Sequence, residues 1–302
     1  MSKPGFSVTQ YEDVSTYAAL VEPLIAADRG RSTIVATVLH AVAASPDPHR
    51  PPVLVVVSRA GESVGVAVAG ATTASSALVT QLMSELLTAA EQHEVAALLA
   101  SAFLGLDPAP AVVTGPRQGS QAFAAGYCAA AGGDSVMHTE LLLYRLDQLN
   151  DPVGVAGSPH IARVDDPADL AVLARWRMEF AGATDAFPPI TEPDVDGARR
   201  AAERGVVQLL WIVDGNPVAL AVHSAVIGGM VRIGPVYTPE ASRGNGYAAA
   251  VTAAAARSAG AAGAADILLF TDASNRTSNG VYQRIGFIEC GAFGEVTLTP
   301  AP

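Results

Sequence analysis

A short glycine-rich segment, Arg243-Gly244-Asn245-Gly246-Tyr247-Ala248, lies between an expected strand and an expected helix. Glycine adopts backbone angles that residues with a Cβ resist, and it lets the backbone approach a ligand closely. The first N–H groups of a helix have no partner within the helix, so they attract an anion. Arg243 adds positive charge and a fork of donors. The segment therefore has the residue types of a loop that binds phosphate groups.

A second segment places a phenol and several polar side chains after an expected strand at 266–272. It contains Asn275, Ser278, Tyr282 and the pair Gly286-Phe287. The phenol of Tyr282 can donate a proton to a leaving group. Taken alone, Tyr282 could equally be a half-buried helix tyrosine, and Asn275 could be only a helix cap or turn residue.

The glycine-rich pattern, [Gln/Arg]-x-x-Gly-x-[Gly/Ala], has little specificity in a chain this rich in Gly and Ala. A second copy occurs at 257–262, at the end of an expected helix and with no strand before it. Gly260 in that copy indicates a helix stop. The copy at 243–248 follows a strand and opens a helix, so its context favours it.

Together, the two segments resemble the GNAT acyltransferase superfamily over about residues 159–299. The resemblance implies that the loop binds the pyrophosphate of CoA, that the strand before it pairs with the pantetheine arm, and that Tyr282 protonates the departing thiolate. Backbone N–H groups of that strand could stabilise the oxyanion. The cofactor-binding residues implied are Val236, Tyr237, Thr238, Arg243, Gly244, Asn245, Gly246, Tyr247, Ala248, Asn275, Ser278 and Tyr282.

The resemblance implies an N-acetyltransferase that moves an acetyl group from acetyl-CoA to a primary amine, without a metal. The acceptor stays open between a small amine, an amino acid, an aminoglycoside-like drug and a peptide N-terminus. The alternative is a non-catalytic acyl-CoA-binding or regulatory module, which would need no proton donor at the sulfur. A general base is not evident. Glu179 is a weak candidate that more simply lies on a solvated helix face, Asp185 and Trp176 could line an acceptor pocket, and His223 fits a satisfied core histidine.

Composition narrows the class of protein. The chain has 302 residues, half of them apolar, 16% charged and only two of them cysteine. This favours a globular protein in a reducing, cytoplasmic setting with no disulfide framework. The net charge of −11 makes nucleic acid an improbable partner, and no apolar run has the length of a membrane span. An oligomer is compatible with all of these features.

The expected fold class is α+β, with two tandem GNAT-like domains, each a mixed, mostly antiparallel sheet flanked by helices. The domains are expected at 1–150 and 158–302, and the second has the order β-α-α-β-β-β-α-β-α-β-β. The first has a similar rhythm but no cofactor motif, so we interpret it as a degenerate copy, with an unrelated α/β domain as the alternative. Whether this half binds any ligand stays open. Its expected helices and strands lie at 14–27, 31–44, 53–58, 64–69, 77–104 (a long helix), 111–113, 118–131 and 136–146.

Overall fold

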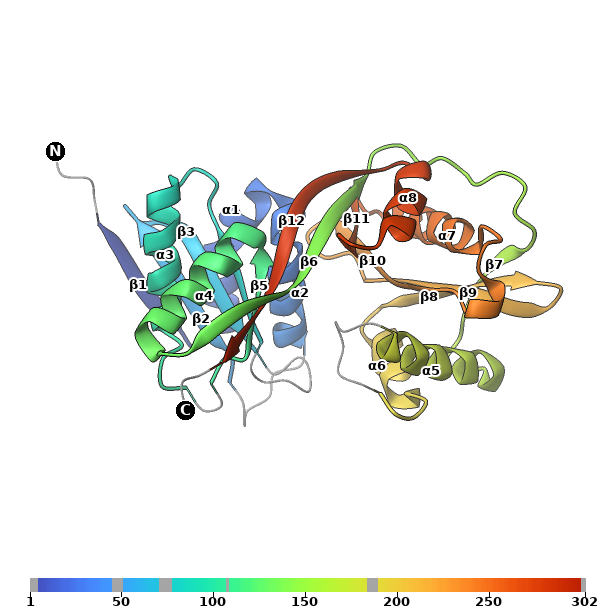
Figure 1. Cartoon of the computed structure of the whole chain (residues 1–302), viewed down its shortest axis with the longest axis horizontal. Helices are drawn as coiled ribbons and strands as arrows, with labels where there is room; N and C mark the ends of the chain where they lie inside the picture. The colour runs from blue at the N-terminus through green and yellow to red at the C-terminus, as the bar shows by residue number, and fades with distance from the viewer. Residues whose placement is uncertain (1–4, 45–50, 71–77, 107–108, 184–189, 300–302) are drawn as a thin grey trace. The chain divides into compact units, whose positions relative to one another are not determined.

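The computed structural model describes residues 5–44, 51–70, 78–106, 109–183 and 190–299, and the chain divides into two compact units (Figure 1). Unit 1 comprises Met1–Leu142 and Gly291–Pro302, and unit 2 comprises Leu143–Cys290. The end of the chain thus belongs to the first unit. The domain ranges 1–150 and 158–302 stay a prediction from the sequence.

Unit 1 has a sheet of order β1-β2-β3-β4-β5-β12. Neighbouring strands are antiparallel except β4 and β5, which are parallel. The helices α3 and α4 cover one face, and α1 and α2 cover the other (Figure 1). The elements are β1 (Phe6–Tyr11), α1 (Val14–Ala27), α2 (Arg29–Ala44), β2 (Val53–Arg59), β3 (Glu62–Ala69), β4 (Leu78–Met83), α3 (Ala89–Ser101), β5 (Val112–Pro116) and α4 (Arg117–Ala131). The strands β6 (Asp134–Leu146) and β12 (Phe287–Thr299) each have residues in both units.

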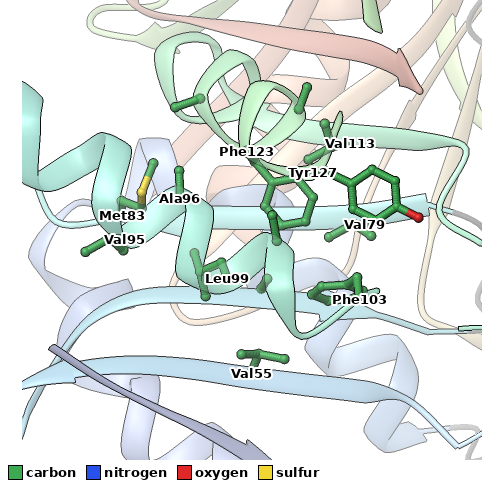
Figure 2. Packing of buried hydrophobic residues seen from close by; sticks show 14 of the residues in the cluster. Val55, Val79, Met83, Val95, Ala96, Leu99, Phe103, Val113, Phe123 and Tyr127 are labelled. Atoms are coloured by element: carbon green, nitrogen blue, oxygen red, sulfur yellow. The ribbon is translucent and has the colours of Figure 1, made fainter. Parts of the chain in front are cut away.

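The larger core of unit 1 lies between the sheet and the pair α3 and α4. Figure 2 shows Val55, Val79 and Val113, which come from three strands, packed around Leu99 and the aromatic rings of Phe103 and Phe123. These rings meet edge to face, with centroids 5.7 Å apart. Alternation along β2 and β3 is replaced by continuous apolar runs, because helices cover both faces of these strands.

Unit 2 repeats the arrangement with the order β6-β11-β10-β9-β8-β7. Its strands β7 to β10 are antiparallel neighbours, and β10 and β11 are parallel. A core of Leu173, Trp176, Ala198, Leu210 and Leu220 joins α5 and α6 to the sheet. The elements are β7 (Ser158–Ile161), α5 (Pro167–Gly182), α6 (Val195–Glu203), β8 (Val207–Val213), β9 (Asn216–His223), β10 (Met230–Tyr237), η1 (Glu240–Ser242), α7 (Tyr247–Ala261), β11 (Asp266–Asp272) and α8 (Arg276–Arg284).

The expected α+β class with a mostly antiparallel sheet is confirmed, but three expected elements were wrong. A helix over 77–104 is instead β4 followed by α3, because Leu78–Met83 pairs with strands on both sides and tertiary pairing outweighs its helix-forming residues. The edge strand β1 was missed. Two expected final strands are one strand, β12, because Gly291 and Gly294 do not take a positive φ and no turn forms.

Gly286, which joins α8 to β12, supports the first prediction. Its φ is +99°, and a Cβ there would fall on the carbonyl oxygen of Gln148. Gly263 also has a positive φ, +90°, but a Cβ there would meet open space. We expect Gly286→Ala to lower the free energy of unfolding by about 3 kcal/mol or more, and Gly263→Ala by only about 1–2 kcal/mol. Denaturant unfolding measures both, and equal losses would show that the contact at Gly286 is unimportant.

Candidate active site

The strands β10 and β11 part within unit 2. They pair in parallel from Met230 with Asp266 to Ile233 with Leu269, and the ladder ends there. On the other side of β10 the register shifts between Ile233 and Val236, while Val236 and Tyr237 pair with β9. Gly234 has a φ of +151°, and the cis-linked Pro235 has no N–H to give to a ladder. Within the described strands, β10 beyond Ile233 therefore has ladder partners on one side only.

The glycine-rich loop joins this end of β10 to α7. Gly244 and Gly246 take φ values of +82° and +79°, and a Cβ on Gly244 would meet open space. Gly246 is the N-cap of α7 and caps it with no side-chain hydrogen bond. The first N–H groups of a 15-residue helix are therefore available to an anion. The predicted backbone freedom of this loop is confirmed, whereas ligand binding by it stays a prediction.

Two side chains of the loop hold its shape. Arg243 Nε donates to the Thr238 carbonyl at 3.1 Å, so the guanidinium ties the loop to the end of β10 while remaining exposed. Asn245 Nδ2 donates to the carbonyls of Ser242 and Arg243 at 3.2 and 3.1 Å. The competing copy at 257–262 lies in the last turns of α7, where carbonyls rather than N–H groups point outward.

Asn275 and Ser278 form the start of α8. Asn275 Oδ1 accepts a hydrogen bond from the Ser278 N–H at 3.0 Å, so Asn275 is the N-cap of this helix. The sequence left open whether Asn275 was a cap or a ligand contact, and the cap is what the structure shows. Its amide NH₂ remains exposed, and contact of Asn275 and Ser278 with a cofactor stays a prediction.

Tyr282 lies two turns into α8 and is only 8% exposed. Its ring packs edge-on against Phe287, with centroids 6.3 Å apart. Burial raises the pKa of the Tyr282 phenol to about 12. The side chain thus keeps its proton at neutral pH, which is the form that a proton donor requires.

Two buried oxygens close to these elements lack partners in the described part of the chain. They are Thr238 Oγ1, just after β10, and Asn279 Oδ1, on α8. Asn279 precedes Tyr282 by three residues, so the two share a helix face. Buried polar atoms are normally paired, and two orphaned oxygens beside the parted strands fit a polar ligand there. The sequence analysis missed Asn279, although its spacing from Tyr282 could have indicated it.

The phenol of Tyr237 reaches across the sheet face to α5. Its Oη donates to Glu179 Oε2 at 2.9 Å, and its ring packs edge-on against Trp176 and Phe180 at 5.9 and 6.4 Å. Arg175 Nε lies 3.6 Å from the other oxygen of Glu179. Glu179 is therefore not on a purely solvated face as expected, because its carboxylate connects α5 to the end of β10. Burial, followed by the Glu179 hydrogen bond, raises the pKa of Tyr237 to about 12.

The other candidates have structural roles. Trp176 is 2% exposed and lies in the core. His223 is also buried, and its two ring nitrogens lie 2.9 Å from the Ser224 carbonyl and from Ser258 Oγ. Burial lowers its pKa, as expected for a satisfied core histidine. Asp185 lies outside the described residues.

Two kinds of feature are absent from the described residues. In the part of the chain that the structure describes, no three His, Cys, Asp or Glu side chains gather as a metal-binding group. No helix within the same ranges is both long and apolar enough to cross a bilayer.

Comparison with known proteins agrees with this geometry. Residues 170–287 match the model of the family described as Acetyltransferase (GNAT). A comparison with curated proteins gave no match. Residues 170–287 are thus similar to the domain of this family.

Solved structures share the fold over nearly the whole chain. A GCN5-related N-acetyltransferase from Kribbella flavida has 19% identity and a TM-score of 0.56, over 90% of this chain and 96% of its own. A tandem GNAT protein from the clavulanic acid biosynthesis pathway has 12% identity and a TM-score of 0.60, over 99% and 100%. A GCN5-related N-acetyltransferase from Sphaerobacter thermophilus has 15% identity and a TM-score of 0.56, over 98% and 96%. The chain therefore has the fold of GNAT proteins, a tandem member included.

The contact between Tyr237 and Glu179 supports the second prediction. Glu179→Gln keeps an oxygen acceptor but removes the negative charge that favours the protonated phenol. We expect the pKa of Tyr237 to fall by roughly one unit and to stay above that of a free tyrosine, because the ring remains buried. NMR of ¹³Cζ-labelled tyrosine against pH measures it, with Tyr237→Phe to assign the resonance. Glu203→Gln, at the exposed end of α6, is the control. An unchanged pKa in Glu179→Gln would contradict the pairing.

Proposed function

We propose that this chain is an N-acetyltransferase that moves the acetyl group of acetyl-CoA to a primary amine of a small molecule or peptide. The main support is the joint geometry of unit 2, where β10 loses its β11 partner and the chain then enters an uncapped helix through two glycines of positive φ. A backbone edge and an anion-binding helix start thus follow each other within a few residues. This sequence of features suits an extended amide-containing arm that ends in a pyrophosphate.

Each part of the cosubstrate has residues that fit it. The N–H groups of 244–248 and the guanidinium of Arg243 would hold the pyrophosphate. The backbone of Val236, Tyr237 and Thr238 would pair with the pantetheine amides, in place of the missing strand. The orphaned oxygens of Thr238 and Asn279 would accept hydrogen bonds from the same arm. Asn275 and Ser278 lie at the start of α8, and their spacing places them on the same helix face as Tyr282.

The proposed reaction needs a proton donor for the departing sulfur. The acetyl thioester supplies an activated carbonyl, to which the neutral amine adds as its N–C bond forms and the C–S bond breaks. Tyr282 would give the Oη proton to the sulfur, because its raised pKa keeps it protonated at neutral pH, and the proton that the nitrogen loses as the amide forms would return to the phenolate. The backbone N–H groups at the end of β10 would stabilise the carbonyl oxygen as it gains charge.

The proton of the acceptor ammonium must also leave. Glu179 contacts this strand end through the phenol of Tyr237, so it is our candidate for accepting that proton. An acidic protein favours a cationic acceptor over nucleic acid or an anionic membrane. The low cysteine content favours a cytoplasmic setting. Acetyl-CoA turnover against a panel of amino acids, aminoglycosides and peptide N-termini tests the reaction, with released thiol as the readout.

Gly246→Val tests the loop. A valine would be strained at a φ of +79°, and its Cβ would lie 3.0 Å from Val155 Cγ2, so the loop that should meet the pyrophosphate would have to change shape. Affinity for acetyl-CoA should fall by well over tenfold, about 1.4 kcal/mol or more, in a calorimetric titration. Gly260→Val is the control, because a Cβ on this helical glycine meets open space. If Gly260→Val lost acetyl-CoA binding while Gly246→Val kept it, the loop would be the copy at 257–262 and not the copy at 243–248.

Tyr282→Phe tests the proton donor and separates an enzyme from a binding module. The change keeps the ring and its packing on Phe287, so kcat should fall by roughly 10²–10⁴ while the KM for acetyl-CoA moves little. Since the acid form is lost only as pH rises through about 12, Tyr282 should cause no alkaline loss of wild-type kcat up to about pH 10. Tyr127→Phe, in the core of unit 1, is the control. A module that only binds would release no thiol with any amine, in the wild type or in either variant.

A further inference from the structure

In unit 1 the parallel ladder between β4 and β5 ends part-way along the strands, as the ladder between β10 and β11 does in unit 2. The strands β4 and β5 pair from Leu78 with Val112 to Thr80 with Thr114, and the ladder ends there. Beyond this point β4 continues along β3, and β5 continues along β12. Element for element, β4, α3, β5 and α4 correspond to β10, α7, β11 and α8. Unit 1 therefore has a gap at the position where unit 2 is proposed to hold the pantetheine arm.

The side chain of Gln81 lies in that gap. It is the first residue of β4 after the ladder ends, and it is 1% exposed. Gln81 Nε2 donates to the Pro116 carbonyl at the end of β5 at 3.2 Å and approaches Ser120 Oγ of α4 at 3.3 Å. A Cβ added to Gly115 or to Gly119 would fall on the Gln81 amide. The gap is therefore filled by an amide of the protein itself, packed against two glycines.

The residues around this amide give the gap a polar lining. Thr80 Oγ1, Gln81 Oε1 and Thr114 Oγ1 are buried without a hydrogen-bond partner in the described part of unit 1. An apolar core would normally exclude such atoms. Gln81 supplies a polar group there but leaves no room for an extended arm.

The helix start in unit 1 is closed as well. Thr88 and Glu91 form a reciprocal capping box at the N-terminus of α3, with bonds of 3.3 and 2.9 Å. Arg59 Nη1 holds Glu91 Oε1 at 2.8 Å, and the Glu91 side chain is only 15% exposed. A carboxylate thus occupies the place that an anion would take. The connection before the helix is also shorter, 84–88 in unit 1 against 238–246 in unit 2.

We propose that unit 1 is closed to acyl-CoA by its own side chains, Gln81 between the parted strands and Glu91 at the helix start, so that each chain binds one acyl-CoA, in unit 2. The binding of one acyl-CoA in unit 2 rests on the proposed function, whereas the closure of unit 1 does not. The unit then acts as a folded scaffold whose former opening is occupied by its own side chains.

Calorimetric titration of the full chain with acetyl-CoA tests the stoichiometry. We expect about one site per chain in the wild type and none in Gly246→Val. Hydrogen exchange with and without acetyl-CoA locates the site, and protection should appear in 234–248 and 270–282 but not in 81–91 or 112–120. Two sites, or a site in Gly246→Val with protection in 81–91, would overturn the closure of unit 1. No binding at all would overturn the proposed function while agreeing with a closed unit 1.

Gln81→Ala tests the occupant itself. The change empties the gap and leaves the Pro116 carbonyl and Ser120 without their amide partner, so the ratio of unfolded to folded protein should rise at least tenfold. Gln10→Ala is the matched control, because Gln10 lies exposed on the edge strand β1 of the same unit. Denaturant unfolding measures both variants. Equal stabilities for Gln81→Ala and Gln10→Ala would show that Gln81 fills no structural role between the strands.

Discussion

The parting of β10 and β11 after Ile233 and Leu269 is the constraint on which the site in unit 2 depends. A parallel pair that continued would satisfy the backbone of Val236 and Tyr237 on both sides and leave nothing for a ligand. The positive φ of Gly234 and the missing N–H of Pro235 accompany the end of the ladder. The chain leaves β10 for α7 and β11 for α8 just beyond the point where the ladder between the two strands ends. The proposed roles of the glycine-rich loop and of Tyr282 depend on this arrangement.

The two units show two solutions to one problem. Parted strands and a helix start both leave polar groups that must be satisfied. Unit 1 fills these places with its own side chains, the Gln81 amide between the strands and the Glu91 carboxylate at the helix start. Unit 2 leaves the start of α7 without a side-chain cap. Among the described residues, buried oxygens without partners remain beside the parted strands of both units, on Thr80, Gln81 and Thr114 in unit 1 and on Thr238 and Asn279 in unit 2. The two units thus differ in the side chains that lie at the same strand ends and helix start.

Two tyrosines of unit 2 have similarly raised pKa values for different reasons. Burial alone raises the pKa of Tyr282, whose phenol has no protein partner among the described contacts. Tyr237 is raised by burial together with its hydrogen bond to Glu179. A phenol without a partner is free to give its proton to a substrate, whereas one bound to a carboxylate is held in place. The structure therefore distinguishes Tyr282, a candidate proton donor, from Tyr237, whose side chain links β10 to α5. From the sequence, only the backbone of Tyr237 was expected to have a role.

The sequence by itself determined the periodic elements of unit 2, the glycines of the loop and the tyrosine of α8, because turn chemistry and helix starts are local properties. It also distinguished the two copies of the loop pattern by their context, since a strand precedes 243–248 and a helix precedes 257–262. Only the tertiary structure decided that Leu78–Met83 is a strand, because its neighbours β3 and β5 outweigh its helix-forming residues. Contacts distant in sequence likewise decided the roles of Gln81 and Glu179. Each depends on a partner at least 35 residues away, Pro116 and Tyr237, and no local pattern specifies such a partner.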